Sequence, residues 1–305
     1  MGAFTRTSRA ALLGVLVGTL GACSTVRNPG EEISDLPPAT LPQSLPGDHY
    51  VYDDGHIERV QAVSLGGTRW RIANGLGEYV LDADYTLPPS QWRGGGVVAK
   101  QLFTASNLSF WPLQAGNSNT IDSQMAVNQD GRTLTYEERW RCEVEGAQRL
   151  ALAIGVTDTQ LVTCTRRSSS GYNTHQQTWY HAPSLAHWVR KIDRTSGAWR
   201  HATQRDLVAY RQIPRSLSLA QATRHEVQLQ QALETVATGQ RYTWQTDAGS
   251  GKEVFSLRSE LLVLDTFVSQ QQLVCRHVTL ADQAQPAQAL TFCRSDAEWV
   301  LSVAG

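Results

Sequence analysis

The chain has little net charge, no basic block and, beyond its first 22 residues, no long hydrophobic run. Its 27 Lys and Arg are balanced by 28 Asp and Glu, which leaves a formal net charge of −1 at pH 7. Because proteins bind nucleic acid chiefly through clustered Lys and Arg, this composition predicts no nucleic-acid partner. A bilayer crossing needs about 20 consecutive apolar residues, and no later stretch supplies them.

Catalytic and cofactor motifs are also missing from the sequence. There is no Gly-x-Ser-x-Gly nucleophile elbow, no phosphate-binding Gly-x-x-x-x-Gly-Lys and no Cys-x-x-Cys pair. His225-Glu226 begins like the zinc motif His-Glu-x-x-His, but position 229 is Leu. Glu137 and Glu138 are adjacent, and adjacent strand residues point to opposite faces, so we expect no shared acid/base role. We therefore predict that the protein is not an enzyme and has no cofactor and no metal site.

Four histidines remain as candidates for a metal or acid/base site. His175, His181 and His187 recur at six-residue steps, and His201 follows. Even spacing places strand residues on one face, but Pro183 is expected to interrupt any single strand. No carboxylate that could orient an imidazole is apparent nearby. We expect scattered surface histidines here.

The N-terminus has the pattern of an export signal. Arg6 and Arg9 form a positive start, and an uncharged apolar run follows over residues 10–20. This run is too short to span a bilayer and is typical of a secretory signal peptide. It ends in Leu20-Gly21-Ala22-Cys23, which resembles the lipobox of bacterial lipoproteins. The resemblance implies that residues 1–22 are removed and that Cys23 carries lipid, including a palmitate-like acyl chain. The alternative is an ordinary secreted protein in which Cys23 has no role.

The residues after Cys23 bear on where such a lipoprotein resides. Ser24 follows the cysteine in place of Asp, which resembles Gram-negative lipoproteins that move on to the outer membrane. The resemblance implies a lipid-anchored envelope protein that faces the periplasm or the cell surface. Residues 23–47 are polar and contain five prolines, which favour extended, hydrated backbone. We expect them to form a lipidated, proline-rich tether.

Four cysteines remain once Cys23 is lipidated, and an even number is typical of an oxidising periplasm. Three pairings are possible, and the spacing favours local ones. Cys275 and Cys293 flank a predicted hairpin turn, which brings cross-strand Cβ atoms within bridging range. Cys142 and Cys164 lie in two strand-like stretches and form the other predicted disulfide bond. Each bridge closes a loop of about twenty residues, which stabilises a fold by about 3 kcal/mol.

The hydrophobic pattern predicts a mainly β protein of the α+β class. Short alternating runs separated by turn residues predict an antiparallel β-rich periplasmic domain over residues 48–211. Pro88-Pro89 and the glycines at 94–96 predict a flexible loop within it. Apolar residues then recur at three- and four-residue steps over residues 217–236, which predicts one linking helix. The segment 217–305 is therefore expected to be this helix followed by a small antiparallel β domain.

The C-terminal quarter of the chain contains a set of glycines, tryptophans and Cys-Arg pairs: Gly239, Trp244, Gly249-Ser250-Gly251 with Val254, Cys275-Arg276, Cys293-Arg294 and Trp299. With this set, residues 226–301 resemble the bacterial surface-antigen domain of outer-membrane lipoproteins of the 17-kDa antigen type. The resemblance implies a helix before a small sheet, with the two Cys-Arg dipeptides on facing strands. Two features depart from the family. Glu298 stands where the family usually has Gly, and the family's glycine-rich hydrophobic stretch is absent.

Nine tryptophans are many for this length. Each buries about 150–250 Å² in a core, so core packing is the expected role for most of them. Exposed tryptophans could instead stack on glycan rings. We predict an outer-membrane-anchored lipoprotein with a structural or binding, non-catalytic role, whose partner is an envelope protein or a glycan such as peptidoglycan. The alternative function is a periplasmic envelope hydrolase or a regulator of one.

Overall fold

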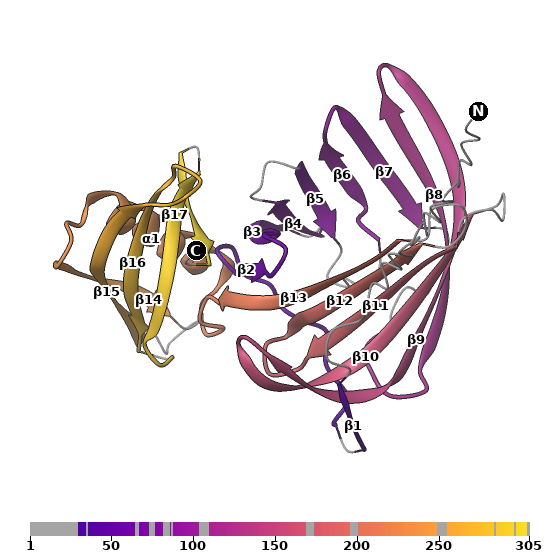
Figure 1. The fold of residues 1–305 in the computed structure, drawn as a ribbon, viewed down its shortest axis with the longest axis horizontal. Helices are drawn as coiled ribbons and strands as arrows, with labels where there is room; N and C mark the ends of the chain where they lie inside the picture. Colours follow the sequence, from indigo (N-terminus) through magenta and orange to yellow (C-terminus); the bar gives the residue numbers. More distant parts are fainter. Residues whose placement is uncertain are drawn as a thin grey trace, which may run out of the picture.

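A computed structural model describes residues 30–34, 36–64, 67–72, 77–81, 86, 88–103, 110–168, 174–195, 201–248, 255–283, 285–295 and 297–303. The predicted signal peptide and Cys23 lie outside this set. The structure is mainly β, as predicted: a large and a small antiparallel sheet, with helix α1 (Leu219–Thr235) between them along the chain (Figure 1). Within the described residues, no helix combines the length and the apolar content that a membrane crossing requires.

The large sheet closes on itself. Its thirteen strands follow the order β1-β9-β10-β11-β12-β13-β2-β3-β4-β5-β6-β7-β8, and β8 also pairs with β9. The closed ring therefore contains the twelve strands β2 to β13, while β1 pairs with the end of β9 that β8 does not reach. The strands are β1 (Glu31–Ile33), β2 (His49–Tyr52), β3 (Ile57–Ser64), β4 (Gly67–Ile72), β5 (Gly77–Leu81), β6 (Gln91–Gly94), β7 (Val97–Phe103), β8 (Ser118–Gln129), β9 (Arg132–Leu152), β10 (Gly155–Ser168), β11 (Thr174–Ala182), β12 (His187–Thr195) and β13 (His201–Arg211).

Alternation along the longest strand shows why the sheet has a distinct inside. On β9, Glu138, Trp140, Cys142 and Val144 are buried, whereas the residues between them are exposed. Cys142 is paired in register with Cys164 on β10, and the two form a disulfide bond, as the spacing predicts. The even positions of β9 therefore face the interior of the ring, and the odd positions face solvent.

The glycines at 94–96 lie in the β-hairpin of β6 and β7, and not in the flexible loop predicted there. Gly94 ends β6, and Gly95 and Gly96 form the hairpin turn to β7 with φ angles of 57° and 79°. Such positive φ angles are readily adopted by glycine, which makes these residues suited to a tight hairpin.

The segment predicted as a tether is packed against the sheet over much of its length. Strand β1 pairs with residues 147–149 of β9, and Ala39 forms a bridge with Leu113. Leu45 is buried as well. Apolar residues of this segment therefore reach the core between its prolines.

The small sheet has the strand order β14-β15-β16-β17-β18. Its strands are β14 (Arg241–Ala248), β15 (Phe255–Val268), β16 (Val274–Asp282), β17 (Gln288–Ser295) and β18 (Glu298–Ser302). Cys275 and Cys293 face each other across β16 and β17 and form the second predicted disulfide bond. The two Cys-Arg dipeptides thus lie on facing strands.

Helix α1 begins where the sequence predicts and packs its apolar face on the small sheet. The Ser218 side chain accepts from the backbone of Gln221, whose side chain accepts from the backbone of Ser218, which forms a complete capping box. Leu229 and Leu233 are fully buried on the same helical face. The helix ends at Val236, and Gly239 belongs to the turn that follows.

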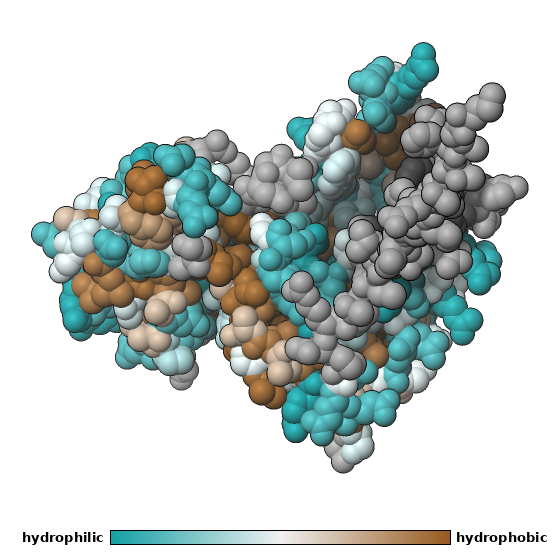
Figure 2. All heavy atoms as spheres, in the orientation of Figure 1, coloured by the Kyte–Doolittle hydropathy of each residue, from teal (hydrophilic) through white to brown (hydrophobic). Residues whose placement is uncertain are grey.

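One hydrophobic cluster joins the two sheets, separate from the cluster inside the large sheet. Val51 on β2 belongs to the cluster of buried residues centred on the helix and the small sheet, and Ile57 and Val208 of the large sheet pack against it. Figure 2 shows hydrophobic residues gathered on the surface between the two parts. The outer face of the closed sheet near β2 and β13 is therefore the docking face for the C-terminal part.

Candidate functional site

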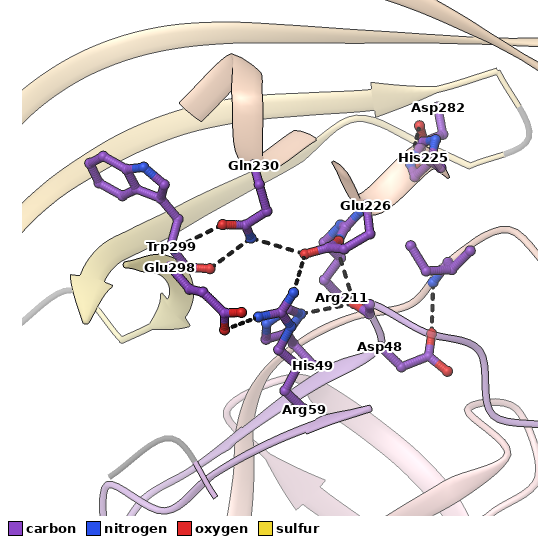
Figure 3. Close-up of polar contacts among 12 residues, drawn as sticks. Asp48, His49, Arg59, Arg211, His225, Glu226, Gln230, Asp282, Glu298 and Trp299 are labelled. Atoms are coloured by element: carbon purple, nitrogen blue, oxygen red, sulfur yellow. Dashed lines mark hydrogen bonds and ion pairs between the residues drawn. The ribbon is translucent and has the colours of Figure 1, made fainter. Parts of the chain in front are cut away.

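A buried polar cluster joins helix α1 to the closed sheet (Figure 3). Glu226 on α1 accepts hydrogen bonds from Nη1 of Arg211 at 2.6 Å and from Nη2 of Arg59 at 3.1 Å. Arg59 on β3 also donates to Glu298 on β18. Glu298 is the residue that stands where the surface-antigen family usually has Gly. Its ion pair with Arg59 ties the last strand to the closed sheet.

The pKa values of the cluster show that its charges are fixed. Burial would raise the pKa of Glu226, but the positive charges of Arg211 and Arg59 outweigh it and lower that pKa to about 2. Burial, together with the charge of Arg59, lowers the pKa of His49 to about 3. At neutral pH Glu226 is therefore ionised between two guanidinium groups, beside the neutral imidazole of His49. Such fixed pairing suits a structural junction.

The residues carried by the surface-antigen resemblance hold the helix on the small sheet. Arg276 donates to the carbonyl of Val236 at the helix end at 2.5 Å and lies over the ring of Trp299 at 5.2 Å. Arg294 pairs with Glu234 at 3.1 Å, and Trp299 donates to the same carboxylate at 3.0 Å. A cation at a helix C-terminus is favoured by the exposed carbonyls there. These residues clamp the helix.

Trp244 completes this clamp from the other edge of the small sheet. Its Nε1 donates to Nδ1 of His225 at 3.2 Å, and both side chains are buried. The pair His225-Glu226 thus serves packing and the junction. The sequence contains no signal for the partners of this pair, which lie on distant strands.

A cavity of about 370 Å³ lies inside the closed sheet. Rings of about eight strands are just filled by their own side chains, whereas wider rings leave internal space. Twelve strands therefore enclose more volume than the core fills. The aromatic residues on the cavity wall are Tyr79, Trp92, Trp140, Trp179 and Trp188, and the polar ones include His56, Glu58, Gln101, Glu138, Arg166, His175, Gln177, Lys191 and Arg205.

One carboxylate of the cavity wall is held by histidine and tyrosine. Glu58 accepts from His56 Nε2 at 3.0 Å and from the Tyr52 hydroxyl at 3.3 Å, and His187 Nε2 lies 3.7 Å away. Burial would raise the pKa of Glu58, but the hydrogen bonds from His187 and His56 outweigh it and hold that pKa well below its usual range. Glu58 is therefore ionised at neutral pH.

The strands β9 to β12 contribute cations that lie beside aromatic rings. Arg166 pairs with Glu138 at 3.3 Å, and its guanidinium lies 5.7 Å from the Trp140 ring centre. Lys191 lies 4.3 Å from the ring centre of Trp179 and 3.2 Å from Asp193. Burial lowers the pKa of Lys191, although the charge of Asp193 opposes this. The wall thus offers ring faces and fixed charges side by side.

The expectation of scattered surface histidines is wrong for His181 and His187. Both are buried, and burial lowers the pKa of His181 to about 3. His187 stacks on Tyr50 with ring centres 3.6 Å apart. Pro183 does not break a single strand, because it lies in the turn between β11 and β12. The two histidines therefore lie on neighbouring strands at the same end of a hairpin inside the ring. The side chain of His201 is outside the described set.

The other acidic and aromatic predictions fit the structure more closely. Glu137 is exposed whereas Glu138 is buried at the cavity, so the adjacent pair points to opposite faces as expected. Core packing is confirmed for six tryptophans: Trp70, Trp140, Trp179, Trp188, Trp244 and Trp299. Three of these also line the cavity, so core packing and a position beside a ligand site are combined in the same side chains. The described residues contain no group of three or more side chains placed to hold a metal ion.

No protein-family model matches the chain, and no curated protein matches it. Among solved structures, the chain is similar to the hypothetical lipoprotein YmcC from Escherichia coli (K12), with a TM-score of 0.39 and 10% identity. That match covers 59% of this chain and 86% of the other. A likeness of this degree carries no argument about function, so the site must be interpreted from its own residues.

Replacing Glu226 by Gln tests the junction. The change leaves Arg211 and Arg59 buried without their shared carboxylate, so we expect the free energy of unfolding to fall by about 3 kcal/mol. Glu234→Gln on the same helix is the matched control. Its partner Arg294 is 45% exposed, so we expect a loss below about 1 kcal/mol. Urea denaturation measures both, and equal losses would contradict a junction that depends on Glu226.

Acid should destabilise the fold well above the pH at which carboxylates titrate. Burial lowers the pKa of His49 and His181 to about 3 and that of His225 to about 4, from an ordinary 6.5. Below pH 6.5 the unfolded chain takes up these protons while the folded chain does not, so the contribution of these three groups to stability is constant above this pH and is lost below it. The full slope is about 1.4 kcal/mol per pH unit for each histidine, or about 4 for three.

Burial raises the pKa of Asp48, so the folded chain takes up this proton before the unfolded chain does. Asp48 therefore contributes a gain in stability as the pH falls, opposite to the histidines. Burial also lowers the pKa of His187, so Asp48 is a single group against four histidines and the net slope keeps its sign. Urea denaturation between about pH 7.5 and about pH 5 measures the effect. A free energy of unfolding that stays constant across this range would show that the three imidazoles are not buried in neutral form.

Proposed function

We propose that the protein is acylated at Cys23, is anchored in the outer membrane and binds an envelope ligand in the cavity without converting it chemically. The observation that carries this proposal is the cavity of about 370 Å³. Ligand sites are typically concave spaces of about 300–1,000 Å³ with mostly apolar walls and a few fixed polar groups. The cavity has this size and this mixture of side chains.

The charged groups of the wall support binding more than catalysis. Hydrolysis of a glycosidic bond needs one carboxyl group that keeps its proton near neutral pH. Glu58 is held in the ionised form by His56 and His187. Glu138 is paired with Arg166. Both carboxylates of the wall thus have the partners expected of fixed hydrogen-bond acceptors, and the hydrolase remains the alternative.

The anchor and the cavity are compatible in space. Glu31, the first residue of β1, is eight positions after Cys23 (31 minus 23). Eight residues reach at most about 29 Å when fully extended. Strand β1 pairs with residues 147–149 of β9, whereas the hairpin of β8 and β9 turns at the opposite end, after Gln129. A lipid on Cys23 therefore holds the β1 end of the body near the membrane.

Replacing Cys23 by Ser tests the anchor. Without the thiol there is no site for the diacylglycerol, so we expect the protein to move from the membrane fraction to the soluble periplasmic fraction. Ser24→Asp is the matched control, because it leaves the cysteine intact and is expected to change only which membrane retains the protein. Fractionation with intact-mass spectrometry measures both. A Cys23→Ser protein that still sediments with membranes would overturn the anchor.

Filling the cavity tests the binding site. Ala99 on β7 lines the cavity, whereas its neighbour Val98 is exposed on the outer face of the same strand. We expect Ala99→Trp to weaken saturable binding of anilinonaphthalene sulfonate, a fluorescent aromatic anion, by about tenfold or more. Val98→Trp should leave the affinity unchanged. Fluorescence titration of the purified protein measures this, and equal behaviour of the two variants would contradict binding in the cavity.

A further inference from the structure

The inner face of the closed sheet carries one continuous row of apolar and aromatic side chains across seven strands. Each member is the direct register partner of the next, and residues directly opposite in antiparallel strands share a face. In order from β3 to β9 the row is Val60, Trp70, Tyr79, Trp92, Ala99, Val127 and Leu134. The row therefore runs across the strands.

Exposure increases along this row. Val60 and Trp70 are buried in the core, and Tyr79 and Trp92 are half-buried on the cavity wall. Leu134, at the far end, is 51% exposed. Strand β9 extends there beyond its neighbour β10, whose last paired residue, Ser168, lies opposite Glu138. The β8–β9 hairpin stands at the top of Figure 1. The row thus leads from the core, along the cavity, to the open inner face of the β8–β9 hairpin.

A second pair continues the same surface. Met125 lines the cavity, and its register partner Tyr136 is 42% exposed on the same face. Apolar side chains left this exposed on the inside of a closed sheet are unusual, because the same face is buried elsewhere in the ring. A contiguous exposed apolar strip of this kind is a mark of a binding surface.

The charged groups that line the same cavity decide which ligand fits. An acyl chain has no groups for the ionised Glu58, for the Arg166–Glu138 pair or for Lys191, and covering them with hydrocarbon would cost desolvation energy. A sugar ring has an apolar face of C–H groups, which packs on an aromatic ring, and a belt of hydroxyls, which bind carboxylates and cations. The cavity presents both kinds of partner.

We propose that the cavity and the row bind a linear oligosaccharide, with one segment inside the ring and the following sugars over β6 to β9. This rests on the proposed binding function and names its ligand class. Neighbouring strands are about 4.8 Å apart, so the three steps from Trp92 to Leu134 span about 14 Å. The distance of about 4.8 Å between neighbouring strands is close to the length of one pyranose residue. Successive sugars therefore meet side chains on successive strands.

The test uses the full acylated protein in a detergent without a sugar headgroup. A panel of bacterial capsule, lipopolysaccharide and peptidoglycan oligosaccharides is screened, and the best series is titrated calorimetrically from monosaccharide to hexasaccharide. We expect affinity to rise with length up to about the tetrasaccharide, because β6 to β9 supply about one contact for each strand. Bound oligosaccharide should also displace anilinonaphthalene sulfonate.

Two matched leucine variants locate the sugars. Leu134→Ser removes the exposed end of the row and should weaken only the longer oligosaccharides, by about tenfold. Leu102→Ser is the control, since Leu102 is 66% exposed on the outer face of β7. It should leave every affinity unchanged. Trp92→Ala should weaken all lengths, and Trp92→Phe should restore most of the loss if ring stacking is the cause.

Each outcome has one meaning. If anilinonaphthalene sulfonate or palmitate binds in the cavity and no oligosaccharide does, the saccharide assignment is wrong while the binding function stands. If no probe binds, both fall. If a monosaccharide binds as tightly as the hexasaccharide, or if Leu134→Ser and Leu102→Ser behave alike, the extended row is not part of the site. Thermal unfolding of each variant separates lost binding from lost folding.

Discussion

The pairing of β13 with β2 joins the two ends of the run of strands β2 to β13 and gives the molecule an interior. Residues 207–211 of β13 pair with residues 49–52 of β2. Without this contact the sheet would have two free edges and two solvated faces. With it, the buried tryptophans, the ion-paired cavity wall and the docking face for the C-terminal part all have fixed places. Strand number then sets the interior volume, and twelve strands leave room for a cavity.

An interior that contains polar groups requires that each charge has a partner. Glu226 between Arg211 and Arg59 meets this need at the junction, and Glu58 between His56 and His187 meets it at the cavity. The two clusters differ in whether they border an empty cavity. The junction is closed by packing from both sheets, whereas the groups around Glu58 border empty volume. The same chemistry therefore locks the fold in one place and leaves hydrogen-bonding capacity for a ligand in the other.

Local features of this fold could be predicted from the sequence, and non-local ones could not. The Ser218 cap, the helix and the hairpin disulfide of Cys275 and Cys293 depend on residues close in the chain, and the structure has all three. Closure depends on β13 meeting β2, which is more than 140 residues away. The burial of His181 follows from that closure, as do the partners of Glu226. Alternation marks which strand residues share a face, but not whether that face meets solvent or the inside of a ring.

The tryptophans show why the sequence could not choose between core packing and ligand binding. In a filled core an aromatic side chain contacts only protein, and on a surface it contacts only solvent or ligand. Trp140 and Trp188 are buried yet border the cavity, and Trp92 is half-buried beside them. Their rings hold the walls in place and also face the volume that those walls enclose. Because one side chain does both, losing its ring weakens the fold and the site together, so the exposed end of the row at Leu134 is where binding can be changed without disturbing the core.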